Sequence, residues 1–399
     1  MKSGPLDVRV SGPLVPFRDG FGEYLDGCGY ARVSATNHVR LLAHVSRWMA
    51  SVGLDVGELS EVEGELFLAD RRAGGYKSYL SLQALVPLLG FLRSVGATPE
   101  RVVVGPVGPT EELVDAYRCW LVEERGLVAT TVEQHLRSAR LFLGLARVEV
   151  GSLTAADVHR FVERECPSRS VAVAKTLVSC TRSFLRFLFA AGWTAVDLSS
   201  AVPPVAAWQG TVLPKALAPE ALAALLASCD RNTAGGRRDY AVLVLLSRLG
   251  LRAGEVAGLC LNDIDWDAGE ITVTGKGSRV ERLPLPADVG EAIVDYLAHG
   301  RRQTTDRHVF IALVAPHGPM TRTGVNGVVR LGCDRAGIER FGPHRLRHSA
   351  ATNMLRAGAA LTEVGQVLRH RSVLTTAIYA KCDTEALGSL AMVWPGGVR

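Results

Sequence analysis

The order of apolar and polar residues predicts helices over most of the chain. Apolar residues recur at three- and four-residue spacing in segments such as 111–126 and 237–250, and turns that contain glycine separate these segments. A different pattern occupies residues 269–286, where apolar and polar residues alternate on both sides of the sequence GKGS. Alternation around a glycine-rich turn predicts a β-hairpin with Lys276 at its tip. We therefore expect a mainly α-helical protein with one small antiparallel sheet in its C-terminal domain.

The helical pattern of the N-terminal half occurs twice. Three pairs of segments resemble each other at offsets of 97, 94 and 96 residues, which agree to within a small insertion or deletion. The pairs are 36–49 with 132–146, 57–70 with 151–164, and 88–96 with 184–192. The repeat predicts two tandem helical modules, at residues 1–105 and 106–205.

The second of these modules carries basic residues on its predicted helix faces. Thr110 and Thr154 are predicted to cap two of its helices, because each precedes a helical pattern with acidic residues in the first turn. The basic residues are candidates for contacts to DNA phosphates, and the alternative is the solvated surface of a generic helical bundle. They are Arg137, Arg140, Lys175, Arg182 and Arg186.

A proline-rich segment, residues 201–220, separates the modules from the rest of the chain. Prolines lack a backbone donor and stiffen the chain, so this segment predicts an interdomain linker with a boundary near Thr211. Beyond it we expect a C-terminal domain over residues 211–399, with helices around the hairpin.

Composition limits the classes of protein to which the chain can belong. With 399 residues the chain is long enough for two or three domains. No apolar run reaches the length of a membrane span, and the N-terminus lacks an apolar signal core, so we expect a cytoplasmic protein, associated with the nucleoid if it binds DNA. The eight cysteines are scattered without metal-binding spacing, which predicts reduced thiols. A net charge of +5 is only a weak indication that the protein binds nucleic acid. Only six of the 45 basic residues are lysines, so a lysine in the hairpin turn, Lys276, is unusual for this chain.

Candidate chemistry concentrates in residues 342–380, which hold three histidines, five arginines, one glutamate and a single tyrosine, Tyr379. His344 and Arg347 lie one helical turn apart, after a helix start at Pro343. His348 is the next candidate, either supporting the site or packing in the core.

Each of these residues has an ordinary structural explanation when taken alone. Arg252 follows Gly250 at a helix start, which suits an anion, but it can also pair with Glu255. Lysines on hairpins such as Lys276 are usually solvated, and a tyrosine such as Tyr379 usually packs half-buried.

Together the residues match the needs of phosphodiester chemistry. Arginines bind the non-bridging oxygens in pairs, a lysine or histidine supplies the proton for the leaving oxygen, and a phenol can act as the nucleophile. The motifs contain no converging carboxylates for a two-metal site and no phosphate-binding loop for ATP, so we predict no metal and no cofactor.

Four segments in this order resemble the catalytic boxes of the tyrosine recombinases, also called the phage integrase family. They are GLRAGEVAGL, VTGKGSRVERLPLP, PHRLRHSAATNML and VGQVLRHRSVLTTAIYAKC. The resemblance covers roughly residues 110–399 and implies a helical core-binding domain and a catalytic domain that form a C-shaped clamp around DNA. One box departs from the family pattern, because Arg369 replaces the glycine that usually precedes His370.

The resemblance also implies a role for each site residue. Arg252 and Arg347 would clamp the scissile phosphate, Lys276 would protonate the leaving 5′ oxygen, and Tyr379 would form a 3′-phosphotyrosyl intermediate. His344 would assist proton transfer and His370 would hydrogen-bond the phosphate. Arg345, Arg356 and Arg371 are expected on the DNA backbone or the surface.

The implied partner is double-stranded DNA at specific recombination sites. The resemblance implies that a homo-tetramer binds this DNA and assembles through the tail after Tyr379. Related recombinases or accessory proteins are possible further partners, and no membrane is expected to be involved. The role of residues 1–105 stays open between DNA binding and assembly. Two other functions remain possible at this stage: a type IB topoisomerase, and a DNA-binding accessory protein whose catalysis is dispensable.

Overall fold

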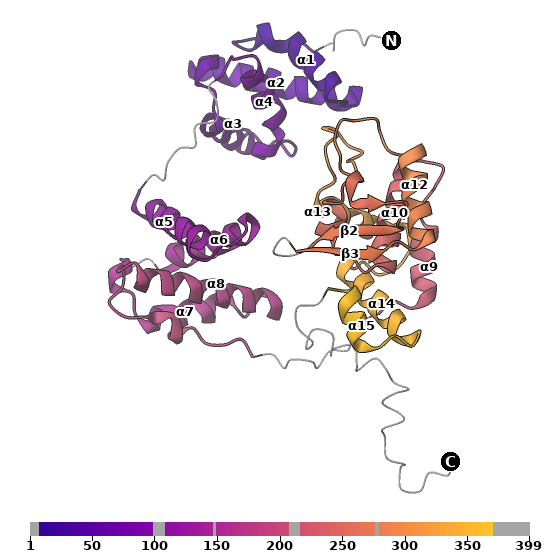
Figure 1. Ribbon diagram of the computed structural model, residues 1–399. Helices are drawn as coiled ribbons and strands as arrows, with labels where there is room; N and C mark the ends of the chain where they lie inside the picture. The colour runs from indigo at the N-terminus through magenta and orange to yellow at the C-terminus, as the bar shows by residue number, and fades with distance from the viewer. Residues whose placement is uncertain (1–7, 99–107, 147–148, 207–215, 276–278, 370–399) are drawn as a thin grey trace. The chain divides into compact units, whose positions relative to one another are not determined.

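The computed structural model describes residues 8–98, 108–146, 149–206, 216–275 and 279–369 (Figure 1). By internal contacts the chain divides into one compact unit at residues 101–211 and another formed by residues 1–100 and 212–399. Separate apolar cores lie in what we call the first module (8–98), the second module (108–206) and the C-terminal module (216–369). Among the described helices, none has the length and apolar character needed to cross a bilayer.

The first module consists of four α-helices joined by short 3-10 turns. Ser60 starts the third α-helix with a capping box, in which the Glu63 carboxylate accepts from the Ser60 backbone N–H at 3.1 Å. Gly53, with a φ of +70°, ends the second. The elements are η1 (Val15–Phe17), α1 (Arg18–Gly27), α2 (Arg32–Val52), η2 (Val56–Glu58), α3 (Glu61–Ala73), η3 (Leu82–Ala84) and α4 (Val86–Ser94).

The second module also has four α-helices, and one of its two predicted helix caps is present. Thr154 and Asp157 form a capping box at the third helix, as predicted. The prediction for Thr110 is wrong: the first helix begins at Pro109, because proline is preset for the first helical position and needs no donor there. The elements are α5 (Pro109–Glu123), α6 (Ala129–Ala146), η4 (Val150–Ser152), α7 (Ala155–Glu165), α8 (Val171–Ala190) and η5 (Leu198–Ala201).

The two modules share their order of helices at nearly constant offsets. The starts of α2 and α6 are 97 residues apart, those of α3 and α7 are 94 apart, and the ends of α4 and α8 are 96 apart. They differ in the last helix, because α8 has 20 residues whereas α4 has nine and carries Pro87 in its first turn. An irregular segment with η3 therefore takes the place of the first half of α8.

The C-terminal module places a small sheet among seven helices of the described chain. The predicted hairpin is present: β2 pairs with β3 antiparallel, from Glu270 opposite Pro284 to Thr274 opposite Val280, and a two-residue strand extends the sheet in the order β1-β2-β3. The elements are α9 (Pro219–Ala227), α10 (Ala234–Arg248), α11 (Ala253–Ala257), η6 (Leu261–Asp263), β1 (Ile264–Asp265), β2 (Glu270–Thr274), β3 (Val280–Pro284), α12 (Ala287–His299), α13 (Arg322–Ala336), α14 (Pro343–Arg356) and α15 (Leu361–Val367).

Helix α10 is the centre of this module. It packs against α12, α13 and α14, and six consecutive residues from Ala241 to Leu246 are buried. A helix that is apolar on all sides must be covered on all sides. Truncation of a core leucine such as Leu245 to alanine should cost about 2–5 kcal/mol. This rigid helix ends at the chain segment that carries Arg252.

Candidate active site

The junction between α10 and α11 depends on a glycine. Gly250 has a φ of +58°, and a Cβ built on it would lie 2.6 Å from Cδ2 of Leu368. Any other residue would be strained and would push away the end of α15. The turn brings the Gly250 carbonyl and the start of α11, at Arg252, next to residues from α14 and α15.

Arg252 is the N-cap residue of α11 and pairs with Glu255. Its Nη1 donates to Glu255 Oε1 at 2.6 Å, and its backbone N–H donates to Oε2 at 2.7 Å. The Glu255 side chain is only 4% exposed, whereas 39% of the Arg252 side chain is exposed. The ion pair considered from the sequence is therefore present, and it orients a guanidinium that still has an open side for an anion.

Arg347, from α14, is held by backbone carbonyls. It is 1% exposed, its Nη1 donates to the Gly250 carbonyl at 2.6 Å, and its Nη2 donates to the Leu368 carbonyl. Both of these acceptors are neutral, so neither of them offsets the charge of the guanidinium. Leu346 and Ala350 on the same helix are buried in the core and anchor it.

Arg369 joins the same cluster from the residue after Leu368. Its φ of +54° lies in the left-handed region, which explains why glycine suits this position in the family pattern. The Arg369 side chain is 3% exposed, and its Nη2 donates to Glu255 Oε2 at 2.6 Å. Burial lowers the pKa of this guanidinium from its usual value, and Glu255 opposes that shift. One buried carboxylate thus binds both Arg252 and Arg369.

Two histidines of α14 lie beside the arginines. The rings of His344 and His348 pack edge to face, with centroids 4.5 Å apart. Desolvation, then the charges of Arg347 and Arg252, lower the pKa of His344 below its ordinary value. Desolvation, then His344 and Arg347, lower the pKa of His348 to about 4. Both rings are therefore neutral at pH 7, and His348 supports His344 directly.

The β2–β3 hairpin approaches the same carboxylate. A Cβ built on Gly275 would lie 3.7 Å from Glu255 Oε1, and the Gly275 N–H donates to the Arg279 carbonyl at 2.7 Å. Glu281 on β3 lies 4.0 Å from Nε of Arg369. The described residues next to the turn of the hairpin are therefore beside Arg252 and Arg369.

The structure brings together three of the six predicted catalytic residues: Arg252, His344 and Arg347. The other three, Lys276, His370 and Tyr379, lie outside the described residues, as does Arg371. Sequence reasoning missed the role of Arg369 in holding Glu255. The available signal was an arginine at a position that favours glycine.

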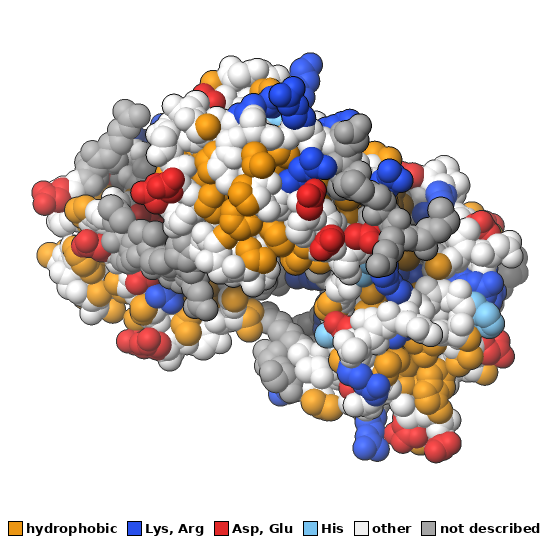
Figure 2. All heavy atoms as spheres, turned by 90° about the horizontal axis from the view of Figure 1, so that it is seen from above, with side chains coloured by type: hydrophobic (Ala, Val, Ile, Leu, Met, Phe, Trp, Pro, Cys, Tyr) orange, Lys and Arg blue, Asp and Glu red, His pale blue; other side chains and the backbone are white. Residues whose placement is uncertain are grey.

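The residues predicted to contact DNA differ in whether they already have an intramolecular partner. Arg140 makes a two-bond pair with Glu111 at 3.0 and 2.9 Å, and Arg182 donates to the Val202 carbonyl at 2.7 Å, so both already have intramolecular partners. Arg345 lies 3.7 Å from Glu339. Arg137 and Lys175 are exposed on α6 and α8. On the face seen in Figure 2, basic side chains form small groups among acidic and apolar ones.

Within the described ranges, no group of three or more His, Cys, Asp or Glu residues could hold a metal ion. Seven cysteines are described, and all are free thiols: Cys28, Cys119, Cys166, Cys180, Cys229, Cys260 and Cys333.

Comparison with known proteins adds independent evidence. Residues 215–386 match the model of the phage integrase family. The predicted integrase/recombinase y4rA of Sinorhizobium fredii is 40% identical over 98% of this chain and 97% of its own length. The tyrosine recombinase XerD of Listeria monocytogenes is 31% identical over 67% of this chain and 93% of its own length.

Solved structures resemble the chain in fold. The XerH site-specific recombinase in a post-cleavage complex with its palindromic difH substrate has a TM-score of 0.57 at 19% identity, over 72% of this chain and 85% of that one. A lambda integrase dimer on a COC′ core site has a TM-score of 0.55 at 14% identity, over 67% of this chain and 94% of that one.

Proposed function

The chain belongs to the phage integrase family, the tyrosine recombinases that cleave and rejoin DNA strands, and we propose that its own reaction proceeds through a covalent bond between Tyr379 and a 3′ phosphate of DNA. The observation that carries the proposal is the cluster formed by Arg252, Arg347 and neutral His344 at one end of α10. Two neighbouring guanidiniums suit the two non-bridging oxygens of one phosphodiester.

The reaction follows from the chemistry of these groups. The Tyr379 oxygen attacks the phosphorus, the bond to the 5′ oxygen breaks, and Lys276 gives that oxygen its proton. His344 is neutral at pH 7 and therefore suited to accept the proton of the phenol. The phosphotyrosyl ester conserves the bond energy, and a 5′-hydroxyl from the partner strand then attacks it and releases Tyr379, so no ATP is consumed.

Two guanidiniums aimed at one phosphate stabilise the charge that develops in the transition state. Removal of one donor of this kind typically costs about 10²–10³ in rate. Arg347 is buried and donates to two backbone carbonyls, whereas Arg252 is partly exposed and pairs with Glu255. We propose that Arg347 fixes the phosphate and that Arg252 closes on it.

Strand exchange joins two DNA sites, and each site is cut on both sides of a spacer, which makes four cuts. We therefore further propose that the chain forms a tetramer on DNA. The proposed docking segment is the apolar tail from Leu387 to Trp394, which lies outside the described residues. We also propose that the second and C-terminal modules grip DNA as a clamp, with Arg137 and Lys175 on the DNA side, because both are exposed and no carboxylate partner is recorded for either in the described chain.

The test uses a pool of nicked duplexes with a randomised central region, incubated with the full chain and denatured. We expect a covalent protein–DNA product whose modified peptide contains Tyr379, and no product from Tyr379→Phe, which should still bind DNA. A product that survives this substitution, or maps to another residue, would refute the assignment. Sequencing of the captured DNA identifies the site.

A further inference from the structure

The first module repeats part of the internal packing of the second module. In each module three aromatic rings pack together, and each ring of one trio lies 96 positions from its counterpart. The centroid distances are 6.4, 5.5 and 5.5 Å in the first module and 6.0, 5.1 and 5.8 Å in the second. The trios are Phe21, Tyr24 and Phe91, and Tyr117, Trp120 and Phe187. Matching contacts at one offset indicate a duplicated fold.

Charge is segregated within the first module. Residues 8–98 contain nine basic and nine acidic residues, so the module is neutral overall. All nine acids lie in residues 19–26 and 55–70. Helix α2 has three arginines, two histidines and no acid, and residues 71–98 have four basic residues and no acid. Two of the four basic residues in 71–98 are ion-paired, Arg72 with Glu65 and Arg93 with Glu61. Arg71 and Lys77 are therefore the residues that this segment adds to the basic residues of α2.

The two carboxylate-free segments meet in space. Arg71 lies at the end of α3, and the distance from its Nη1 to Nδ1 of His44 on α2 is 3.4 Å. The Arg71 guanidinium also stacks on the Tyr76 ring, 4.0 Å from its centroid. The His44 and Tyr76 rings pack edge to face at 5.4 Å. Desolvation, then Arg47 and Arg71, lower the pKa of His44, as expected where positive charge gathers.

We define the α2 face as Arg40, His44 and Arg47 on α2 together with Arg71, Tyr76 and Lys77. The three α2 residues are spaced by four and three positions and so share one side of the helix. Arg40, Arg47, Tyr76 and Lys77 are exposed. Among described residues, Arg47 and Lys77 make no recorded ion pair. Arginine and lysine with an accessible aromatic ring form a surface suited to a phosphate backbone.

The α2 face has a counterpart in the second module. Arg40 on α2 corresponds to Arg137 on α6 at the repeat offset of 97, and Lys77 falls near Lys175 at the offset of 96. One position that we propose for DNA contact in the second module is therefore basic in the first as well, and a lysine lies close to the other.

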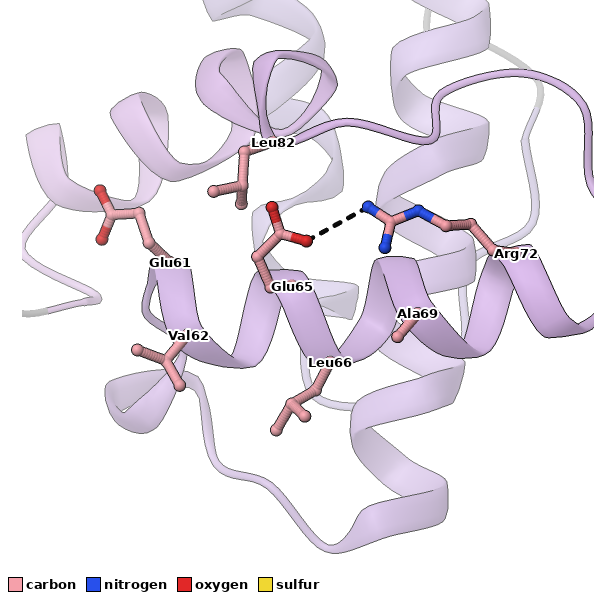
Figure 3. Close-up of a pocket in the computed structure, with 7 residues that line it drawn as sticks. All are labelled: Glu61, Val62, Glu65, Leu66, Ala69, Arg72 and Leu82. Carbon is pink, nitrogen blue, oxygen red and sulfur yellow. Dashed lines mark hydrogen bonds and ion pairs between the residues drawn. The ribbon is translucent and has the colours of Figure 1, made fainter. Parts of the chain in front are cut away.

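Another surface of the first module is less suited to DNA. A groove of about 610 Å³ beside α3 is lined by apolar and charged side chains (Figure 3). They are Val62, Leu66, Ala69 and Leu82 together with Glu61, Glu65 and Arg72. Glu65 pairs with Arg72 at 3.2 Å. Glu61 pairs with Arg93 at 2.7 Å. The charges of the groove are therefore paired within the module, so the groove suits a phosphate backbone less well than the α2 face does.

We propose that the first module is a second duplex-binding module, which uses the α2 face to bind the phosphate backbone of DNA outside the segment held by the second and C-terminal modules. This inference rests on the proposed function, because it assumes that the chain acts on DNA. It assigns residues 8–98 to DNA binding rather than to assembly.

The test measures the binding of the full chain to a mixed-sequence 60-base-pair duplex across a salt series. Replacing Arg40, Arg47 and Lys77 by alanine should weaken binding at least tenfold and reduce the slope of log affinity against log salt by about 2.7, since each phosphate contact contributes about 0.9. Arg40→Lys with Arg47→Lys should keep the slope. The control is Arg18→Ala, which should keep the slope, because Arg18 pairs with Asp19 on α1 and is not part of the α2 face.

The outcomes separate this inference from the proposed function. An unchanged slope in the triple variant, with covalent product still formed at Tyr379, would overturn the inference and leave the recombinase chemistry intact. An unchanged slope with altered sedimentation of the free protein would assign the face to assembly and also overturn it. Failure of the wild-type chain to bind any duplex would instead refute the proposed function. Equal melting temperatures establish that the variants fold.

Discussion

Arg252 and Arg347 have the same proposed target but are held in opposite ways. Arg347 is buried and bound by two neutral carbonyls, those of Gly250 and Leu368. Arg252 is 39% exposed and bound by the Glu255 carboxylate. A carbonyl acceptor holds a guanidinium in position and leaves its positive charge uncompensated. A carboxylate also holds a guanidinium in position, but its negative charge offsets the positive one. The difference explains why a second cation, Arg369, contacts Glu255: it restores the positive potential that the carboxylate removes.

The largest expected effect comes from Arg347→Lys. Lysine keeps the charge but cannot bridge two carbonyls and a phosphate with a planar fork. We expect covalent product to form about 10³-fold more slowly and the free energy of unfolding to fall by about 3 kcal/mol, since two charge-assisted hydrogen bonds are weakened. Single-turnover capture and urea unfolding measure the two quantities. A rate within tenfold of wild type would mean that the carbonyl-held arginine is not the principal phosphate ligand.

A smaller effect is expected from Glu255→Gln, which tests the carboxylate that holds Arg252. The substitution leaves the buried Arg369 guanidinium without a counter-charge, and breaking a buried pair typically costs about 3–5 kcal/mol of stability. The rate of covalent product formation should fall about 10²-fold, because Arg252 loses its orientation.

Arg369→Gly provides the matched control for Glu255→Gln. Glycine relieves about 1–2 kcal/mol of left-handed strain, so the single variant should change stability little while slowing product formation about tenfold. In the Arg369→Gly background, Glu255→Gln should cost about 1–3 kcal/mol less than in wild type. Additive effects in this double-mutant cycle would show that Arg369 and Glu255 do not act as a pair.

These arrangements were only partly predictable from the sequence. The hairpin, the Pro343 helix start and the Thr154 cap follow from local rules of turn and capping chemistry, and the structure confirms them. The repeat was visible because core positions such as Leu88 and Phe184 recur at fixed spacing. The Thr110 cap failed because Pro109 also marks a helix start and took precedence.

The ion pair between Glu255 and Arg369 could not be predicted, because 114 residues separate its members. Only the tertiary fold brings the end of α15 to the start of α11. The intramolecular partners of Arg140 and Arg182 were hidden for the same reason: Glu111 and Val202 are 29 and 20 residues away. A basic residue on a helix face thus gives no information on whether its charge is already bound.

The smallest expected effect concerns pH and the histidine pair. The pKa of His348 falls from its ordinary value of 6.5 to about 4 in the folded chain, because desolvation, His344 and Arg347 all oppose protonation. Between these two pH values the unfolded chain binds more protons than the folded chain, so stability is fully present above pH 6.5 and is lost as pH falls toward 4. His38, His44 and His135 shift in the same direction and contribute to the slope. Urea unfolding at pH 7.5 and pH 5 should show a smaller pH-dependent loss in His348→Gln than in wild type. Equal losses would mean that His348 titrates in the folded chain as it does in the unfolded chain.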